Sequence, residues 1–176
     1  MDELEVFSSV LVNTFNLREE ILGKVDLQKT VYFVKRLGAP VPFAFRWNVF
    51  GPYSYELAHY SNHLVIEGLL QYSGTYSINH ELAKKYRSRL KPETTQRLKT
   101  FFEKVKQICD ESSFDRVHFI ECAASLDFIR SNVSRESKRK EKVFHLLEEL
   151  KPEKREMFRG MREEAWRLLV DQNLAR

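Results

Sequence analysis

Three side chains with metal-binding chemistry recur at four-residue intervals, and they are His59, His63 and Glu67. On a helix, positions i, i+4 and i+8 share one face, so the two imidazoles and the carboxylate would project together. The spacing departs from the H-E-x-x-H pattern that pairs two ligands with a general base. We therefore treat the three as weak metal candidates and expect a solvent-facing polar stripe, with no metal and no other cofactor.

No motif for covalent or phosphate chemistry accompanies this stripe. The two cysteines, Cys109 and Cys122, have no C-x-x-C spacing, and the chain has no G-x-S-x-G nucleophile elbow. The six glycines are scattered, without the spacing of a phosphate-cradling loop. The sequence therefore predicts a protein that is not an enzyme.

The composition is that of an ordinary globular protein. Of the 176 residues, 43% are hydrophobic and 31% are charged, which argues against disordered and fibrous classes. The start of the chain, MDELEVFSSV, is acidic where a signal peptide is basic, and no apolar run approaches the roughly 20 residues that cross a bilayer. With only two cysteines, we expect a reduced cytoplasmic protein without a membrane partner.

Positive charge is concentrated in the second half of the chain. Residues 1–80 hold 6 Lys and Arg against 8 Asp and Glu, whereas residues 81–176 hold 23 against 17. An anionic partner is therefore expected to bind the second half. The candidate contacts with nucleic acid are Lys84, Lys85, Arg87, Arg89, Arg135, Lys138, Arg139 and Lys140.

The first 80 residues show a mixed pattern. Helical periodicity predicts helices over 3–15 and 26–37, with Asp26 as the cap of the second. Alternation of Phe43, Phe45 and Trp47 with smaller or charged residues predicts a strand. A third helix is predicted from Gly51-Pro52 to Gly68, and a β-hairpin follows, with Gly74 at its turn.

This order of helix, helix, strand, helix, strand and strand is the layout of a winged helix-turn-helix. The wing would span Gln71 to Asn79. From residue 81 on, four helices are predicted to open near Pro92, Ser112, Ser134 and Pro152. The predicted class is mostly α with a small antiparallel β element. A winged-helix-like domain over 1–80 would carry a basic helical extension over 81–176, packed on it as one integrated unit.

The third helix lacks the residues that read DNA. Base readout and phosphate contacts rely on cations, yet no Arg or Lys occurs between Arg46 and Lys84. A nucleic-acid-binding regulator is therefore the alternative function, with its contacts in the basic second half.

An aromatic cluster surrounds the Gly-Pro turn, and Phe50, Tyr53 and Tyr55 belong to it. In one interpretation the rings frame the domain core and the entrance to the third helix. In the other they form an exposed amphipathic patch that anchors a protein partner, since aromatic residues dominate interface hot spots. The first interpretation is favoured, and both can hold at once.

A family resemblance adds to these patterns. Leu27-Gln28-Lys29, Tyr32-Phe33, Trp47 and Phe50-Gly51-Pro52 resemble the pattern of the Panacea domain, the SocA-like antitoxin group. The fuller runs LQKTVYFVKRL, GPYSYEL and EGLL resemble the YwgA-like proteins, and the likeness covers roughly residues 3–80. The resemblance implies a non-enzymatic antitoxin that neutralises a toxin, or an adaptor that delivers one to a protease.

The leading prediction is therefore a regulatory module that binds a protein partner, with a toxin among the candidates. The resemblance brings in two polar residues, Gln28 and Lys29, beside the aromatic cluster. The expected partner contacts are Gln28, Lys29, Phe50, Tyr53 and Tyr55. The sequence is also compatible with a homo-oligomer.

Overall fold

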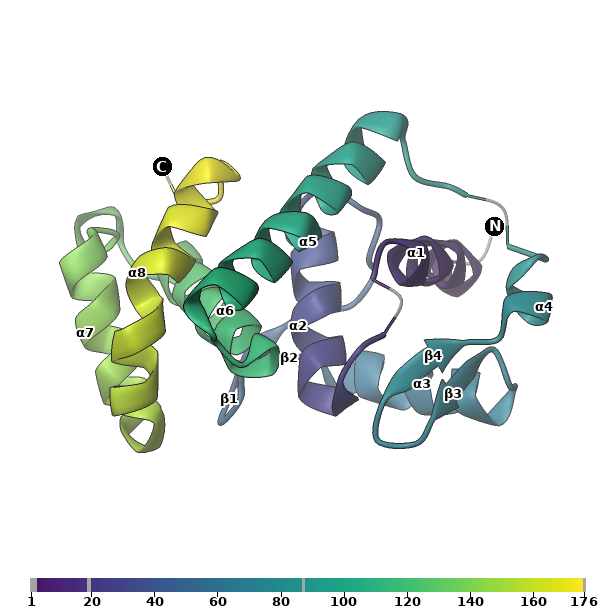
Figure 1. Cartoon of the computed structure of the whole chain (residues 1–176), viewed down its shortest axis with the longest axis horizontal. Helices are drawn as coiled ribbons and strands as arrows, with labels where there is room; N and C mark the ends of the chain where they lie inside the picture. Colours follow the sequence, from purple (N-terminus) through teal and green to yellow (C-terminus); the bar gives the residue numbers. More distant parts are fainter. Residues whose placement is uncertain (1–2, 19, 87, 176) are drawn as a thin grey trace. The chain divides into compact units, whose positions relative to one another are not determined.

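The computed structural model describes residues 3–18, 20–86 and 88–175. It is mostly helical with two short antiparallel strand pairs, which confirms the predicted class (Figure 1). The chain divides into an N-terminal unit, Met1–Arg46 with Tyr53–Phe102, and a C-terminal unit, Trp47–Pro52 with Glu103–Arg176. These bounds differ from 1–80 and 81–176 in two places: residues 81–102 belong with the first unit, and residues 47–52 belong with the second.

The N-terminal unit is built from helices and one β-hairpin. Its elements are α1 (Glu3–Leu17), α2 (Gly23–Arg36), α3 (Tyr55–Ile66), β3 (Leu70–Tyr72), β4 (Tyr76–Ile78), α4 (His80–Ala83) and the first part of α5 (Pro92–Ser112). Strands β3 and β4 are antiparallel, with Leu70 opposite Ile78, so the hairpin predicted around Gly74 is confirmed. Ile21 forms an isolated bridge with Tyr76, which ties the segment between α1 and α2 to this hairpin.

Aromatic rings fill much of the core of this unit. The ring of Phe7 meets Phe43 edge-on at 4.7 Å between centroids, and the rings of Phe33 and Phe101 lie 4.5 Å apart. Contacts of this kind add to the apolar burial that drives folding. Phe43 is buried and Ala44 is exposed, as the alternating pattern predicts.

A buried ion pair joins the start of α2 to the end of α1. Arg18 donates to both carboxylate oxygens of Asp26, at 2.7 and 2.8 Å, and also to the hydroxyl of Thr30 at 2.5 Å. Asp26 was expected to cap α2 at its own position. The helix instead begins three residues earlier, and the Asp26 carboxylate accepts the backbone N–H of Leu22 at 2.8 Å.

The start of the third helix was also predicted too early. Gly51–Tyr53 forms strand β2, which pairs with β1 (Arg46–Asn48), and the predicted strand over 43–47 is regular only at its end. Helix α3 begins at Tyr55 because the hydroxyl of Ser54 accepts the backbone N–H of Leu57 at 3.2 Å. An N-cap of this kind fixes a helix start, whereas proline suits strand edges as well as first turns.

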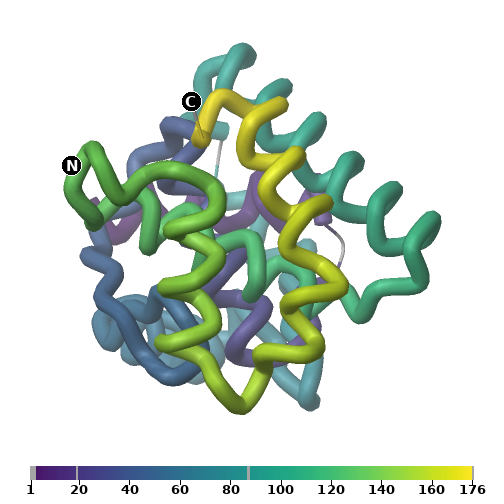
Figure 2. The backbone as a smooth tube through the Cα atoms, turned by 90° about the vertical axis from the view of Figure 1, so that its left-hand side faces the viewer, coloured from purple at the N-terminus to yellow at the C-terminus, as the bar shows by residue number. Residues whose placement is uncertain are grey.

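The C-terminal unit is a helical bundle with one inserted hairpin tip. Besides the end of α5 and the tip, its elements are α6 (Arg116–Asn132), η1 (Arg135–Ser137), α7 (Lys140–Leu150), η2 (Pro152–Lys154) and α8 (Arg155–Asp171). Helix α6 packs against α7 and α8, and the latter two run side by side, joined through η2 (Figures 1 and 2). The four predicted helices are present, but α6 is capped by Asp115 and α7 begins only at Lys140.

Through the described ranges 3–18, 20–86 and 88–175, none of the helices combines the length and the apolar character that crossing a bilayer requires.

Glu148 links α7 to α8 and predicts a specific acid response. Hydrogen bonds from Arg159 and then Arg162 lower the pKa of the Glu148 carboxyl from 4.5 to about 2. A carboxyl with a lowered folded-state pKa stabilises the fold above its unfolded value, and this contribution is lost as the pH falls. Between about pH 4.5 and 2, the melting temperature of Glu148→Gln should therefore fall less than that of the wild type.

The matched control for this measurement is Glu149→Gln, because the Glu149 carboxylate faces His145 rather than an arginine. This control should keep the acid response of the wild type. Equal acid profiles for Glu148→Gln and the wild type would contradict the assignment.

Candidate functional site

The tip of the β1–β2 hairpin is shaped by its own sequence. Gly51 has φ +81°, a left-handed conformation that favours glycine, directly after the turn residues Val49 and Phe50. The side-chain carbonyl of Asn48 accepts the backbone N–H of Phe50 at 3.4 Å. Asparagine and glycine thus close a tight turn and leave two apolar side chains at its apex.

Those two side chains are exposed. Val49 is 67% exposed and Phe50 is 45% exposed, whereas Gly51 and Pro52 behind them are buried. Single exposed apolar residues are common, but here two adjacent ones occupy the apex of a hairpin. The tip is therefore a small apolar projection of the C-terminal unit.

A buried lysine holds the tip from behind. Lys151, between α7 and η2, is fully buried, and its ammonium donates to the backbone carbonyl of Val49 at 2.5 Å. It also donates to the carboxylate of Glu121 in α6 at 2.6 Å. Lys151 lies 102 residues from Val49 in the sequence. Its ammonium thus links the hairpin carbonyl to the Glu121 carboxylate of α6.

A second lysine and three aromatic rings complete this site. Lys154 donates to the other carboxylate oxygen of Glu121 at 2.5 Å, and its ammonium lies 5.5 Å from the centre of the Phe50 ring. The Lys151 ammonium lies 5.8 Å from the ring centre of Trp47 and 5.7 Å from that of Phe158. These are distances at which a cation is attracted to a ring face.

The electrostatics suit a structural clamp. Burial lowers the pKa of the Lys151 ammonium, and its hydrogen bond and charge interaction with Glu121 partly offset that effect. A buried cation is tolerated only when charged and polar partners replace water, and here the Glu121 carboxylate and the Val49 carbonyl do so. We call Lys151, Glu121 and Lys154 the clamp, because they position the tip and lie behind its exposed surface.

Two of the predicted partner contacts are not on the surface. Gln28 is 2% exposed, and its amide exchanges two hydrogen bonds of 2.9 Å with the backbone of Ser54. Lys29 is fully buried. The expectation that both contribute to an exposed binding surface does not fit the structure, since the side chain of Gln28 serves to fix the start of α3.

The tyrosines are placed differently from each other. Tyr55 is 67% exposed at the start of α3, whereas Tyr53 is half-buried and lines a small cavity of about 110 Å³ beside Gln28. Their rings meet edge-on at 5.0 Å. Both belong to the N-terminal unit, while Phe50 belongs to the C-terminal unit.

The polar stripe of His59, His63 and Glu67 faces solvent, as the sequence predicted. His59, His63 and Glu67 all lie on the surface, and a ring nitrogen of His63 is 3.1 Å from the Glu67 carboxylate. Within the described residues, no three His, Cys, Asp or Glu side chains gather as a metal site would require.

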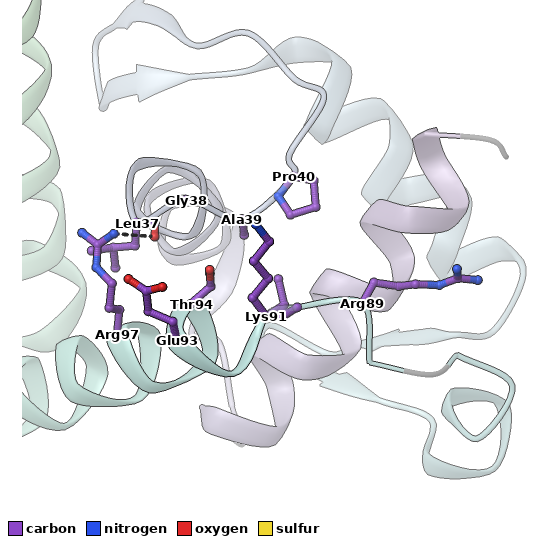
Figure 3. Close-up of a pocket in the computed structure, with 10 residues that line it drawn as sticks. Leu37, Gly38, Ala39, Pro40, Arg89, Lys91, Glu93, Thr94 and Arg97 are labelled. Carbon is purple, nitrogen blue, oxygen red and sulfur yellow. Dashed lines mark hydrogen bonds between the residues drawn. The ribbon is translucent and has the colours of Figure 1, made fainter.

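The basic residues of the N-terminal unit are dispersed. Lys84 pairs with Glu81 at 2.7 Å, Lys85 is exposed, and Arg87 lies outside the described residues. Arg89 borders a hollow of about 450 Å³ between the end of α2 and the start of α5, but its side chain points away from it (Figure 3). Arg97 closes the other side of this hollow by donating to the backbone carbonyl of Leu37 at 3.2 Å.

The basic residues of the C-terminal unit are gathered. Four that the sequence singled out border one shallow depression together with Arg130, Trp166 and Ala175. These four are Arg135, Lys138, Arg139 and Lys140.

Sequence reasoning missed Val49 and the whole clamp. One signal for the clamp was available in the sequence, because Glu121 lies inside the apolar run FIECAASLDFI. A carboxylate in such a run is expected to be buried, and a buried charge needs a partner. The identity of that partner has no local signature.

Three comparisons, with family descriptions, with curated proteins and with solved structures, find no match to this chain.

Proposed function

We propose that this chain is a non-enzymatic regulatory module that binds a protein partner through the tip of the β1–β2 hairpin. The observation that carries this proposal is the pairing of an exposed apolar apex with a buried ionic clamp. Val49 and Phe50 face solvent, yet Lys151 behind them is fully buried and ion-paired.

The clamp supports the hairpin tip at a cost in desolvation free energy. Removing two charges from water costs several kcal/mol per ion, and apolar side chains of similar volume often stabilise a fold as well or better. A clamp of this kind therefore points to a need for a defined tip position. A tip held in one conformation loses little entropy on binding, which favours its use as an interface anchor.

For the N-terminal unit we infer a winged-helix-like arrangement. Helices α1 to α3 precede the β3–β4 hairpin, and we infer that this hairpin serves as the wing expected at Gln71 to Asn79. Trp47 and Phe50-Gly51-Pro52, which are part of the resemblance to the Panacea domain, lie in the hairpin that forms the proposed site. This supports an antitoxin-like or adaptor-like role in the cytoplasm, with a toxin as a candidate partner.

Site-specific photo-crosslinking in the native host tests the proposal. A photoreactive phenylalanine analogue replaces Phe50 in one protein and replaces Ile66 in the control. Ile66 is 84% exposed at the end of α3, so it offers an apolar surface position outside the site. We expect one discrete adduct from position 50, identified by mass spectrometry and reproduced with the purified partner.

Position 66 should give no such adduct. The same adduct in equal yield from position 66 would contradict the proposal, as would a partner that crosslinks at 66 alone.

A further inference from the structure

A cationic depression of about 400 Å³ lies on the C-terminal unit, outside the hairpin tip. We call it the basic depression, and its lining residues are Arg130, Arg135, Lys138, Arg139, Lys140, Trp166 and Ala175. We propose that the basic depression binds single-stranded nucleic acid and seats one nucleotide. This inference goes beyond the proposed protein partner and does not depend on it.

The charge of the depression is largely uncompensated. Residues 130–142 contain 6 Lys and Arg against 2 Glu. Over the described ranges, no carboxylate lies within ion-pairing distance of Arg135, Lys138 or Arg139. Three cations without partners at one hollow attract phosphates, because each phosphate contact releases condensed counterions.

The other two cations are anchored by the protein. Arg130 donates to the backbone carbonyl of Leu174 at 3.2 Å, and this leaves further N–H groups of its guanidinium for a ligand. Lys140 pairs with Glu163 at 3.1 Å and lies 5.8 Å from the ring centre of Phe144. Two of the five cations are therefore held by protein groups, while Arg135, Lys138 and Arg139 carry the available charge.

Trp166 distinguishes this depression from a simple basic surface. Its ring is half-buried and meets the ring of Phe144 edge-on at 5.8 Å with an interplanar angle of 87°. The guanidinium of Arg162 lies 4.7 Å from the centre of the Phe144 ring on which Trp166 rests. The indole thus sits on a packed support among cations, as in sites where a base stacks on an aromatic platform.

Single strands fit this arrangement better than duplexes. Stacking needs the open face of a base, which a duplex hides within its own stack. A volume of about 400 Å³ is in the range of sites for small ligands, and it suits one nucleotide rather than the width of a double helix.

The binding test uses fluorescence anisotropy with a labelled oligothymidylate of about 12 nucleotides. Binding should weaken steeply as salt rises from about 50 to about 200 mM. The triple variant Arg135→Ala, Lys138→Ala, Arg139→Ala should lose at least about tenfold in affinity, and its salt slope should fall by about 2. Its matched control is Lys84→Ala, Lys85→Ala, Arg89→Ala, which removes the same charge from the N-terminal unit and should change affinity less than about twofold.

An equal loss in both triple variants would overturn the proposal, because it would show attraction by net charge. Equal or tighter binding of a duplex of the same length would also overturn it. So would equal competition by inorganic polyphosphate at the same phosphate concentration.

The role of Trp166 is tested in two ways. Trp166→Leu should weaken binding about 5- to 150-fold at temperatures where the variant remains folded. In the wild-type protein, an oligonucleotide with 5-iodouracil should form a photo-crosslink that peptide mapping places at Trp166. A crosslink confined to the N-terminal unit would overturn the assignment even if the leucine variant failed to fold.

Discussion

Replacing Glu121 by alanine should lower the free energy of unfolding by about 3–5 kcal/mol. The substitution leaves the Lys151 ammonium buried with the Val49 carbonyl, and it also removes the carboxylate oxygen that Lys154 binds at 2.5 Å. An unpaired buried cation must either stay desolvated or give up its proton, and both outcomes disfavour the folded state. Chemical denaturation of the purified protein measures this difference.

Two further variants separate the clamp from ordinary ion pairing. Glu81→Ala breaks the exposed pair with Lys84 and should change the unfolding free energy little, since surface pairs are weak. The paired replacement Glu121→Leu with Lys151→Met should recover much of the loss, because it removes both buried charges together. A loss for Glu121→Ala no larger than that for Glu81→Ala would contradict a buried clamp.

Much of the helical architecture could be predicted from the sequence because its signals are local. The apolar positions recurring from Leu4 to Phe15 fall within α1, and the β-prone pieces around Gly74 form the predicted hairpin. The spacing of apolar residues along a segment predicts which face of a helix is buried, even when the element that packs against it is unknown.

The predicted helix starts were wrong where two sequence signals for a start lie close together. Pro52 after Gly51 suits the first turn of a helix, but its fixed φ equally suits the strand that the chain forms there. The better signal was Ser54, whose hydroxyl caps α3. Likewise Asp115, rather than Ser112, caps α6. In both cases a capping side chain defines the start more sharply than a proline or an early serine.

The candidate site could be predicted only in part. Phe50 was identified from local aromatic clustering, and it is exposed. Gln28 and Lys29 stood out as polar residues on a helix, yet both are buried, because polarity does not reveal burial when the partner is distant in sequence. The contact between Lys151 and Val49 is of this distant kind and leaves no local pattern.

Removing the ring of Phe50 should produce the largest effect on partner binding. Phe50→Ala is expected to weaken the complex with the crosslinked partner by about 2–4 kcal/mol, which is about 30- to 900-fold in Kd. The ring is part of the exposed apex, and its backbone is fixed by the clamp, so the substitution removes contact area without releasing the turn. Isothermal titration of the purified partner into each protein gives the two dissociation constants.

The most direct measurement of the central claim is this titration repeated with Ile66→Ala as the matched control. Both substitutions shorten an exposed apolar side chain, and both variants should keep the melting temperature of the wild type. We predict a large loss of affinity for Phe50→Ala and none for Ile66→Ala. Unchanged affinity for Phe50→Ala, with the partner still bound, would contradict the hairpin tip as the partner-binding site.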